Sequence, residues 1–176
     1  MKYHNITKAD MLNGEGLRVV LWVSGCSHHC PACQNAITWD ENVGVPFDEK
    51  AIQEIYDELD QDWCSGITLS GGDPLFLKNR KTIRDLVINI RAKYPEKTIW
   101  SYTGYTFEEL MEQKENDEYL NDILNNIDVL ADGKFVLSLA NVATHYVGST
   151  NQRLIDVPKS IKKGKAVIYK EKEDVI

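Results

Sequence analysis

Two hydrophobic periods divide the chain into strands and helices. Apolar, β-branched runs of the kind found in buried strands occupy residues 17–23, 66–70, 98–102 and 129–132. Apolar residues spaced three and four positions apart, as on one face of a helix, occupy residues 48–59, 78–93 and 106–124. Asp48 is placed to cap the first of these helices, and Pro95 ends the second. The third is expected to break near residues 115–117.

The alternation of strands and helices predicts an α/β fold, with a mostly parallel sheet and outer helices. At 176 residues the chain suits one domain, which we expect to span residues 1–176. Patterns in the last third are weaker, and residues 143–150 and 165–169 are the candidates for further strands. Each predicted strand is followed by a segment that contains glycine, at residues 24–26, 70–73, 103–105 and 132–134. Since the carboxyl ends of parallel strands share one edge of a sheet, these loops predict the ligand site.

Composition narrows the function classes. The net charge of −7 argues against a protein that binds the phosphate backbone, so no nucleic-acid partner is expected. The basic runs at residues 78–81 and 159–165 are interpreted as solvated surface or helix ends. No segment has the length and apolarity of a membrane span, and the first ten residues lack the apolar region of a secretory signal. A cytoplasmic protein without membrane contact is therefore expected.

Three of the four cysteines, Cys26, Cys30 and Cys33, lie within residues 25–34, G-C-S-H-H-C-P-A-C-Q. In a reducing compartment, thiols clustered in this way favour metal ligation over disulfides. A zinc site completed by His28 or His29 is one alternative, although structural zinc sites usually draw ligands from two separated knuckles. Closely spaced thiolates suit an iron–sulfur cluster better. An electron-transfer cluster would need a fourth cysteine, and Cys64 lies before a predicted strand, where a buried structural thiol is expected.

With three protein ligands, one iron of a 4Fe-4S cluster keeps an open coordination position for a substrate. The spacing C-x3-C-x2-C after a first strand resembles the signature of the radical S-adenosylmethionine enzymes. Further motifs are similar to those of one branch, the activating enzymes of anaerobic (class III) ribonucleotide reductase. These motifs are N13-G-E-G-L-R18, S70-G-G-D-P-L75, W100-S-Y-T-G-Y105, D132-G-K-F135 and G148-S-T-N-Q-R153. The chain differs from the branch pattern at Glu15, Ala32 and Gln34.

The resemblance implies a partial (β/α) barrel of the radical S-adenosylmethionine type, with a 4Fe-4S cluster on Cys26, Cys30 and Cys33. It also implies that S-adenosylmethionine is the cofactor. The residues implied to contact it are Ala32, Cys33, Gln34, Gly71, Gly72, Asp73, Asp132 and Lys134. A side chain at Gly72 is expected to obstruct the methionyl end of this cofactor.

By the same resemblance, the enzyme generates a glycyl radical on its reductase partner and takes its electron from a donor such as flavodoxin. The alternatives are a pyruvate formate-lyase type activase, a zinc-stabilised interaction module and a simple electron carrier. His28 and His29 flank the cluster and are expected to be exposed loop residues with no ligand role; the alternative is that they tune the cluster or contact the partner. Arg18, which lies inside a buried strand pattern, is expected either to end the strand or to point at an anion.

Overall fold

The computed structural model describes residues 1–171 of the chain, and its strands form one mixed sheet over that range. The strands are β1 (Lys2–Asp10), β2 (Leu17–Val23), β3 (Val45–Pro46), β4 (Cys64–Gly71), β5 (Thr98–Tyr102), β6 (Val129–Asp132) and β7 (Arg153–Asp156). Their order in the sheet is β3-β1-β2-β4-β5-β6-β7. The central strands β2, β4, β5 and β6 pair in parallel, while β1, β3 and β7 pair antiparallel at the two sides. The predicted α/β fold with a mostly parallel sheet is confirmed.

The predicted helices are also confirmed. They are α1 (Glu49–Leu59), α2 (Arg80–Lys93), α3 (Phe107–Gln113) and α4 (Glu118–Asn126). A further helix, α5 (Val157–Lys163), was not predicted. Asp48 caps α1 by accepting hydrogen bonds from the amides of Lys50 and Ala51. The expected break in the third helical segment is a 3-10 turn (Lys114–Asn116) between α3 and α4. Two more 3-10 turns cover Ala36–Thr38 and Leu137–Leu139.

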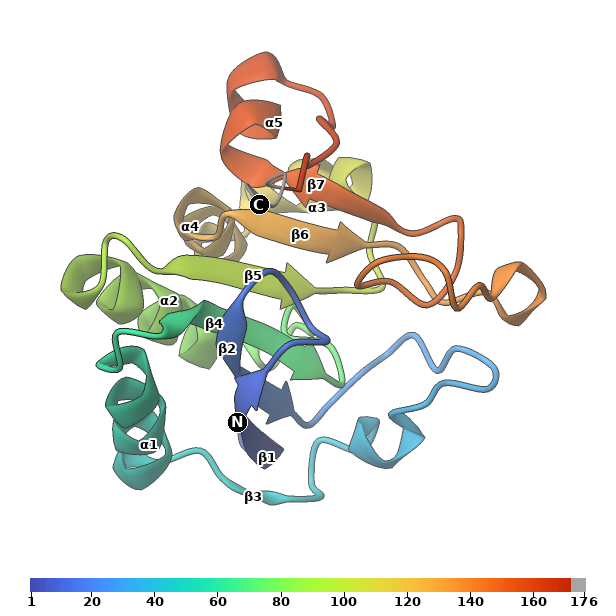
Figure 1. Ribbon diagram of the computed structural model, residues 1–176. Coiled ribbons are helices and arrows are strands. Elements are labelled where there is room, and N and C mark those ends of the chain that lie inside the picture. The colour runs from blue at the N-terminus through green and yellow to red at the C-terminus, as the bar shows by residue number, and fades with distance from the viewer. Residues whose placement is uncertain (172–176) are drawn as a thin grey trace.

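One face of the sheet makes the hydrophobic core with the helices. Alternate residues of β2, β4 and β5, such as Val19, Ile67 and Ile99, pack with buried residues of α1, α2 and α4 in one cluster. Helices α1, α2 and α4 lie on the left of Figure 1, and the loops at the carboxyl ends of β4, β5 and β6 lie to the right. Packing in the core therefore holds the strands in place, and their carboxyl ends continue into loops. Within the described residues, no helix has the length and apolarity needed to cross a bilayer.

Two strand predictions in the last third were wrong. Residues 143–150 form turns, with an isolated bridge between Ala140 and Ser149. Residues 165–169 make one isolated bridge, from Ile168 to Ile155 of β7. The strand that completes this side is β7, a four-residue segment whose pairing with β6 supplies its hydrogen bonds. Such a short segment carries too little periodicity to be recognised without its neighbour.

Arg18 differs from both expectations. It is the second residue of β2, fully buried, and lies over the ring of Trp100. Its guanidinium donates to uncharged oxygens of the hydroxyls of Thr68 and Thr98 and of nearby backbone carbonyls. Burial lowers the pKa of Arg18 to about 10, so it stays charged at neutral pH. Arg18 therefore joins β2, β4 and β5 on the face opposite the helices.

Candidate functional site

Four loops meet at the carboxyl edge of the parallel strands. They are the cysteine loop (residues 25–34) after β2 and the loops that begin at Gly72 after β4, at Thr103 after β5 and at Gly133 after β6. Hydrogen bonds join them: the amide of Asp73 donates to Gly25 O at 2.8 Å, and the amide of Gly133 to Tyr105 O at 2.9 Å. The predicted site residues are therefore collected along one edge of the sheet.

The cysteine loop is tied at its root and bent in its middle. The amide of Gly25 donates to Thr38 O at 2.8 Å, and that of Cys26 to Trp39 O at 3.0 Å. A turn brings the Cys33 amide to 3.1 Å from Cys30 O. His29 and Ala32, on either side of Cys30, have left-handed backbones with φ of 46° and 59°. Side chains other than glycine rarely adopt this conformation, so the loop holds local strain around its central cysteine.

The three loop thiols differ from the fourth in exposure and position. Cys26, Cys30 and Cys33 are partly exposed, whereas Cys64 is buried at the amino end of β4, where it pairs with Leu17. The Cys64 thiol donates to Gly66 O at 3.4 Å. It thus lies at the end of the strands away from the cysteine loop, which confirms that it is a buried structural thiol.

Backbone amides face two of the loop sulfurs. The amide of Asn35 lies 3.4 Å from Cys33 Sγ, and the backbone amides of His28 and His29 lie beside Cys26. Burial raises the pKa of the Cys26 thiol, and these two amides oppose that shift because they stabilise a thiolate. Amide donors around thiolates are typical of sites that hold a metal cluster.

Gly72 lies against the root of the cysteine loop. A Cβ atom at this position would be 2.5 Å from Gly25 O and 3.0 Å from Thr38 O. Its amide donates to Val23 O at 2.8 Å, at the end of β2. Glycine is needed here because the backbone of one loop packs directly on the other. That a side chain at Gly72 would also obstruct the methionyl end of the cofactor stays a prediction.

Asp73 joins three of the four loops. It is buried, and its carboxylate accepts hydrogen bonds from the amides of Leu75 and Gly104 and from Thr103 Oγ1. It also accepts from His28 Nε2, at 2.8 Å. The expectation that His28 is exposed was therefore wrong, because its side chain is 6% exposed, whereas His29 is exposed as expected. A contact between Asp73 and a cofactor amino group stays a prediction.

Two residues at the start of α2 support the loops and were missed. Asn79 is buried, and its amide nitrogen donates to Ser24 O and Asp73 O. Arg80 is buried as well, pairs with Asp117 at 2.7 Å and lies over the ring of Tyr105. Residues 78–81 were interpreted as solvated surface or a helix end: the run does lie at the start of α2, but Asn79 and Arg80 are buried rather than solvated. The helical period did contain a signal, since Arg80 lies three residues before the buried Ile83.

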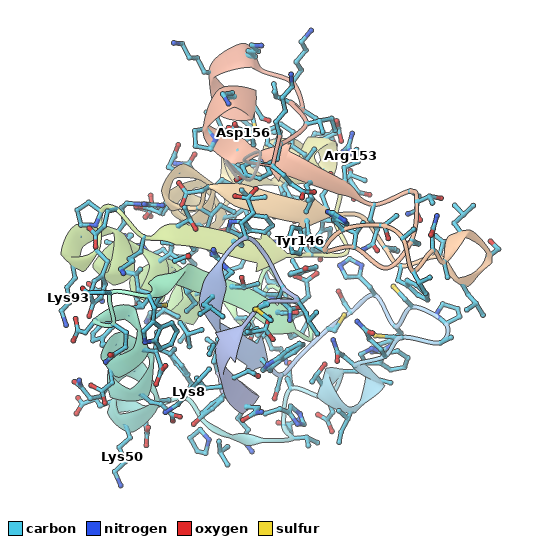
Figure 2. The ribbon with its side chains drawn as sticks, in the orientation of Figure 1. Lys8, Lys50, Lys93, Tyr146, Arg153 and Asp156 are labelled. Carbon is cyan, nitrogen blue, oxygen red and sulfur yellow. The ribbon has the colours of Figure 1, made fainter. Side chains whose placement is uncertain are left out.

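The loop after β6 is held in place by residues of α3 and β7. Asp132 is buried and accepts from the amide of Phe107 at 2.7 Å and from Arg153 Nε at 3.0 Å. Arg153, labelled in Figure 2 at the start of β7, also donates to Glu108. Lys134 is exposed on the loop beyond Asp132. The structure therefore places the Asp132 carboxylate among protein donors and leaves Lys134 at the surface.

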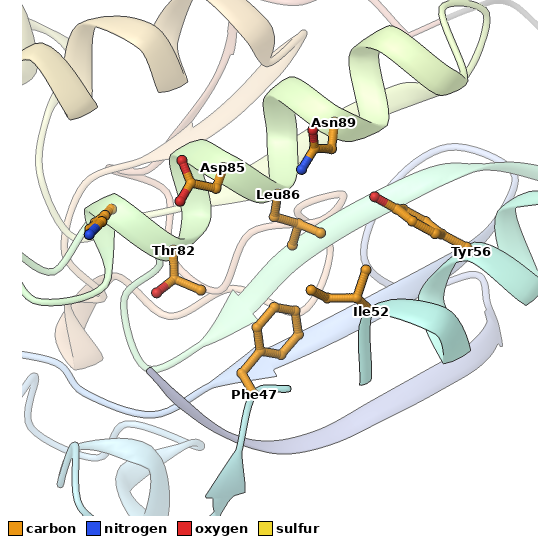
Figure 3. A pocket seen from close by; sticks show the side chains of 8 residues that line it. Phe47, Ile52, Tyr56, Thr82, Asp85, Leu86 and Asn89 are labelled. Carbon is orange, nitrogen blue, oxygen red and sulfur yellow. The ribbon is translucent and has the colours of Figure 1, made fainter. Parts of the chain in front are cut away.

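A cleft on the helix side is separate from these loops. Figure 3 shows it between α1 and α2, with Ile52 and Tyr56 on one side and Thr82, Leu86 and Asn89 on the other. Phe47, Lys81 and Asp85 complete its lining. None of the predicted cluster or cofactor residues lines this cleft.

The donor set of the cysteine loop suits a cluster better than a single ion. Structural zinc sites usually draw their ligands from two separated knuckles, whereas these three thiols share one loop. A multi-iron cluster distributes its thiolates over separate iron atoms, as three partly exposed thiols spaced along one loop allow.

Comparisons with known proteins agree with this reading of the loop. A family model described as a 4Fe-4S single cluster domain matches residues 12–155. A relative from Enterobacteria phage T4, named anaerobic ribonucleoside-triphosphate reductase-activating protein, is 40% identical over 154 residues, which cover 88% of this chain and 93% of the relative. Relatives of the same name from Escherichia coli (strain K12) and Haemophilus influenzae are 42% and 40% identical, and each match covers 86% of this chain and 96% of the relative.

Proposed function

Because the chain belongs to the family of anaerobic ribonucleoside-triphosphate reductase-activating proteins, with its 4Fe-4S single cluster domain, we propose that it activates an anaerobic ribonucleotide reductase by forming a glycyl radical on it. The observation that carries the proposal is the division of the cysteines. Three partly exposed thiols share one loop at the carboxyl edge of the sheet, and the fourth is buried at the other end of its strand. A set of three leaves one iron of a four-iron cluster open to a substrate.

Cys26, Cys30 and Cys33 are the proposed cluster ligands. The amides that face Cys26 and Cys33 would stabilise the thiolates, and the hydrogen bonds to Thr38 and Trp39 would fix where the loop begins. Held by these three cysteines, a reduced cluster would supply the one electron for reductive cleavage of S-adenosylmethionine, the chemistry by which a hydrogen atom would be removed from the α-carbon of a glycine in the reductase.

The cofactor contacts are proposed to come from the loops that flank the cysteines. Ala32 and Gln34 are exposed beside Cys33, and Lys134 is exposed on the loop after β6. Gly71, Gly72 and Asp73 lie between these loops. The carboxylates of Asp73 and Asp132 accept protein hydrogen bonds that fix their positions, and together with backbone groups and Lys134 they are the proposed polar contacts to the cofactor.

The sheet is proposed to be the open, partial barrel of radical S-adenosylmethionine enzymes. An open edge suits a substrate that is a segment of another protein, because a closed barrel would exclude it. A one-electron donor such as flavodoxin and a cytoplasmic setting complete the proposal. The acidic net charge of −7 is consistent with a protein rather than a nucleic acid as the partner.

Iron binding tests the ligand assignment. After anaerobic reconstitution with iron and sulfide, alanine variants of Cys26, Cys30 and Cys33 are each expected to lose the cluster, and Cys64→Ala is expected to keep it. Iron and sulfide per protein are measured together with the electron paramagnetic resonance of the reduced protein. Loss of the cluster in Cys64→Ala would mean four protein ligands and would end the argument for an open iron.

The partner is tested by mixing the reduced protein and S-adenosylmethionine with a candidate enzyme. A glycyl radical signal with an anaerobic ribonucleotide reductase, and none with a pyruvate formate-lyase, is the expected outcome. The reverse pattern would overturn the assignment of the partner but keep the radical chemistry. Cofactor cleavage without a radical on either protein would leave the chain without its proposed substrate.

A further inference from the structure

His28 connects the cysteine loop to two other loops through its side chain. Its Nε2 lies 2.8 Å from Asp73 Oδ2, and because an ionised carboxylate can only accept, Nε2 carries the hydrogen of this bond. The ring packs edge-on against Tyr105, with 4.5 Å between the centroids. A Cβ atom at Gly104 would lie 2.4 Å from the ring, so the loop after β5 has a glycine where His28 passes over it.

The backbone of the same residue faces a proposed cluster ligand. The backbone amides of His28 and His29 lie beside Cys26, and His29 and Ala32 have left-handed backbones. A strained segment keeps its shape only where its surroundings restrain it. The loop is tied by backbone hydrogen bonds at Gly25 and Cys26, and the His28 side chain supplies a further tie two residues beyond Cys26.

We propose that His28 is a positioning residue for the iron–sulfur cluster. Its bond to Asp73 and its packing on Gly104 and Tyr105 hold the cysteine loop so that the amides of residues 28 and 29 face the Cys26 sulfur. Such amide donors stabilise the more negative, reduced cluster and so raise its reduction potential. This inference rests on the proposed function, because it takes Cys26, Cys30 and Cys33 as the cluster ligands.

The first test compares His28→Ala, His28→Gln and His29→Ala in the full chain after anaerobic reconstitution. His29→Ala is the matched control, because it removes the neighbouring exposed imidazole and keeps the backbone amides. His28→Ala is expected to release iron to a chelator about 10- to 100-fold faster than the wild type, the usual range for loss of a group that orients a metal ligand. Its midpoint potential, from a titration followed by electron paramagnetic resonance, is expected to fall. His28→Gln, whose amide can donate to Asp73, should recover most of both.

A second test displaces His28 without changing the cysteine loop. Gly104→Ala should push the ring away and produce the same faster iron release and lower potential, but should add little when His28 is already alanine. Thermal unfolding of the metal-free variants shows whether any of them fails to fold. This double-mutant comparison keeps the inference testable if His28→Ala is poorly stable, because Gly104→Ala leaves every residue of the loop in place.

The outcomes separate this inference from the proposed function. Wild-type iron release and potential in His28→Ala would overturn the role of His28 alone. Equal losses in His29→Ala would also overturn it, because they would show a general sensitivity of the loop. A wild-type chain that takes up no iron under reconstitution would overturn the proposed function and this inference with it.

Discussion

Ala32 is a single residue of the cysteine loop that has a strained backbone. Its backbone has φ of 59°, a left-handed conformation that costs an L-residue roughly 1–2 kcal/mol. The residue lies between Cys30 and Cys33, where the chain must turn so that both thiols stay at the surface. The strain at this position is therefore a property of the site rather than of the fold.

Replacing Ala32 tests this strain. Ala32→Gly removes the left-handed penalty but adds about 0.5–1 kcal/mol of unfolded-state entropy, so the free energy of unfolding should stay equal or rise by up to about 1.5 kcal/mol. Ala32→Val should lower it by more than about 1 kcal/mol, because a β-branched side chain fits this conformation worst. Denaturant unfolding of the metal-free protein measures both. A more stable valine variant would contradict the observed backbone.

Gly72 provides a second prediction at the residue scale. A Cβ atom there would lie 2.5 Å from the carbonyl oxygen of Gly25, so Gly72→Ala should displace the root of the cysteine loop. We expect lower iron content together with weaker cofactor binding. Gly148→Ala is the control, since its Cβ would meet the side chain of Phe135 at 3.1 Å, which can move. Full iron content in Gly72→Ala with poor cofactor binding would return the glycine requirement to the cofactor.

At the scale of elements, Asp117 links α4 to α2. Its side chain caps α4 by accepting from the Leu120 amide at 3.0 Å, and it pairs with the buried Arg80 at 2.7 Å. Burial opposes the charge on Asp117, but the cap and Arg80 outweigh it and lower its pKa. Because Arg80 also lies over the ring of Tyr105, the ion pair between Arg80 and Asp117 connects α4 to the loop after β5.

Two substitutions separate the cap from the ion pair. Asp117→Asn keeps a good cap and loses the charge, whereas Asp117→Ala loses both and should be less stable than the asparagine variant by about 0.5–2 kcal/mol. A carboxyl with a lowered pKa stabilises the fold above its unfolded pKa, near 3.8, and loses that contribution as the pH falls through its folded pKa. The wild type should therefore lose more stability on acidification than Asp117→Asn. Equal acid dependence of thermal unfolding in the two proteins would argue against the ion pair.

Across the whole molecule, the solvent exposure of the cysteines differs between the two ends of the sheet. The loop thiols are partly exposed at the carboxyl edge, and Cys64 is buried at the amino end of β4. Alkylation of a buried thiol requires the surrounding structure to open, so its rate follows unfolding. The two ends of the sheet should thus differ sharply in reactivity.

Thiol labelling of the native, metal-free protein should therefore have two phases. Cys26, Cys30 and Cys33 are expected to react rapidly, while Cys64 should react at a rate that rises with denaturant in parallel with global unfolding. Peptide mass spectrometry identifies each labelled cysteine. The control is the fully unfolded chain, in which all four should react alike. Rapid labelling of Cys64 in the native protein would contradict its place in the core.

The sequence by itself determined the local features. Apolar periods defined β2, β4, α1 and α2, and Asp48 marked the start of α1. The spacing of three cysteines identified the cysteine loop as the proposed cluster site. These features depend on residues a few positions apart, so they can be recognised along the chain. Only the tertiary structure decided β1, whose polar pattern buries Ile6 alone among its nine residues and whose hydrogen bonds come from β2 and β3. It also decided the bond from His28 to Asp73 and the burial of Arg18 and Arg80, because most of their partners lie 33 to 80 residues away. A polar side chain carries no mark of such a partner in its own neighbourhood, since burial becomes favourable for it only when the fold supplies the hydrogen bonds.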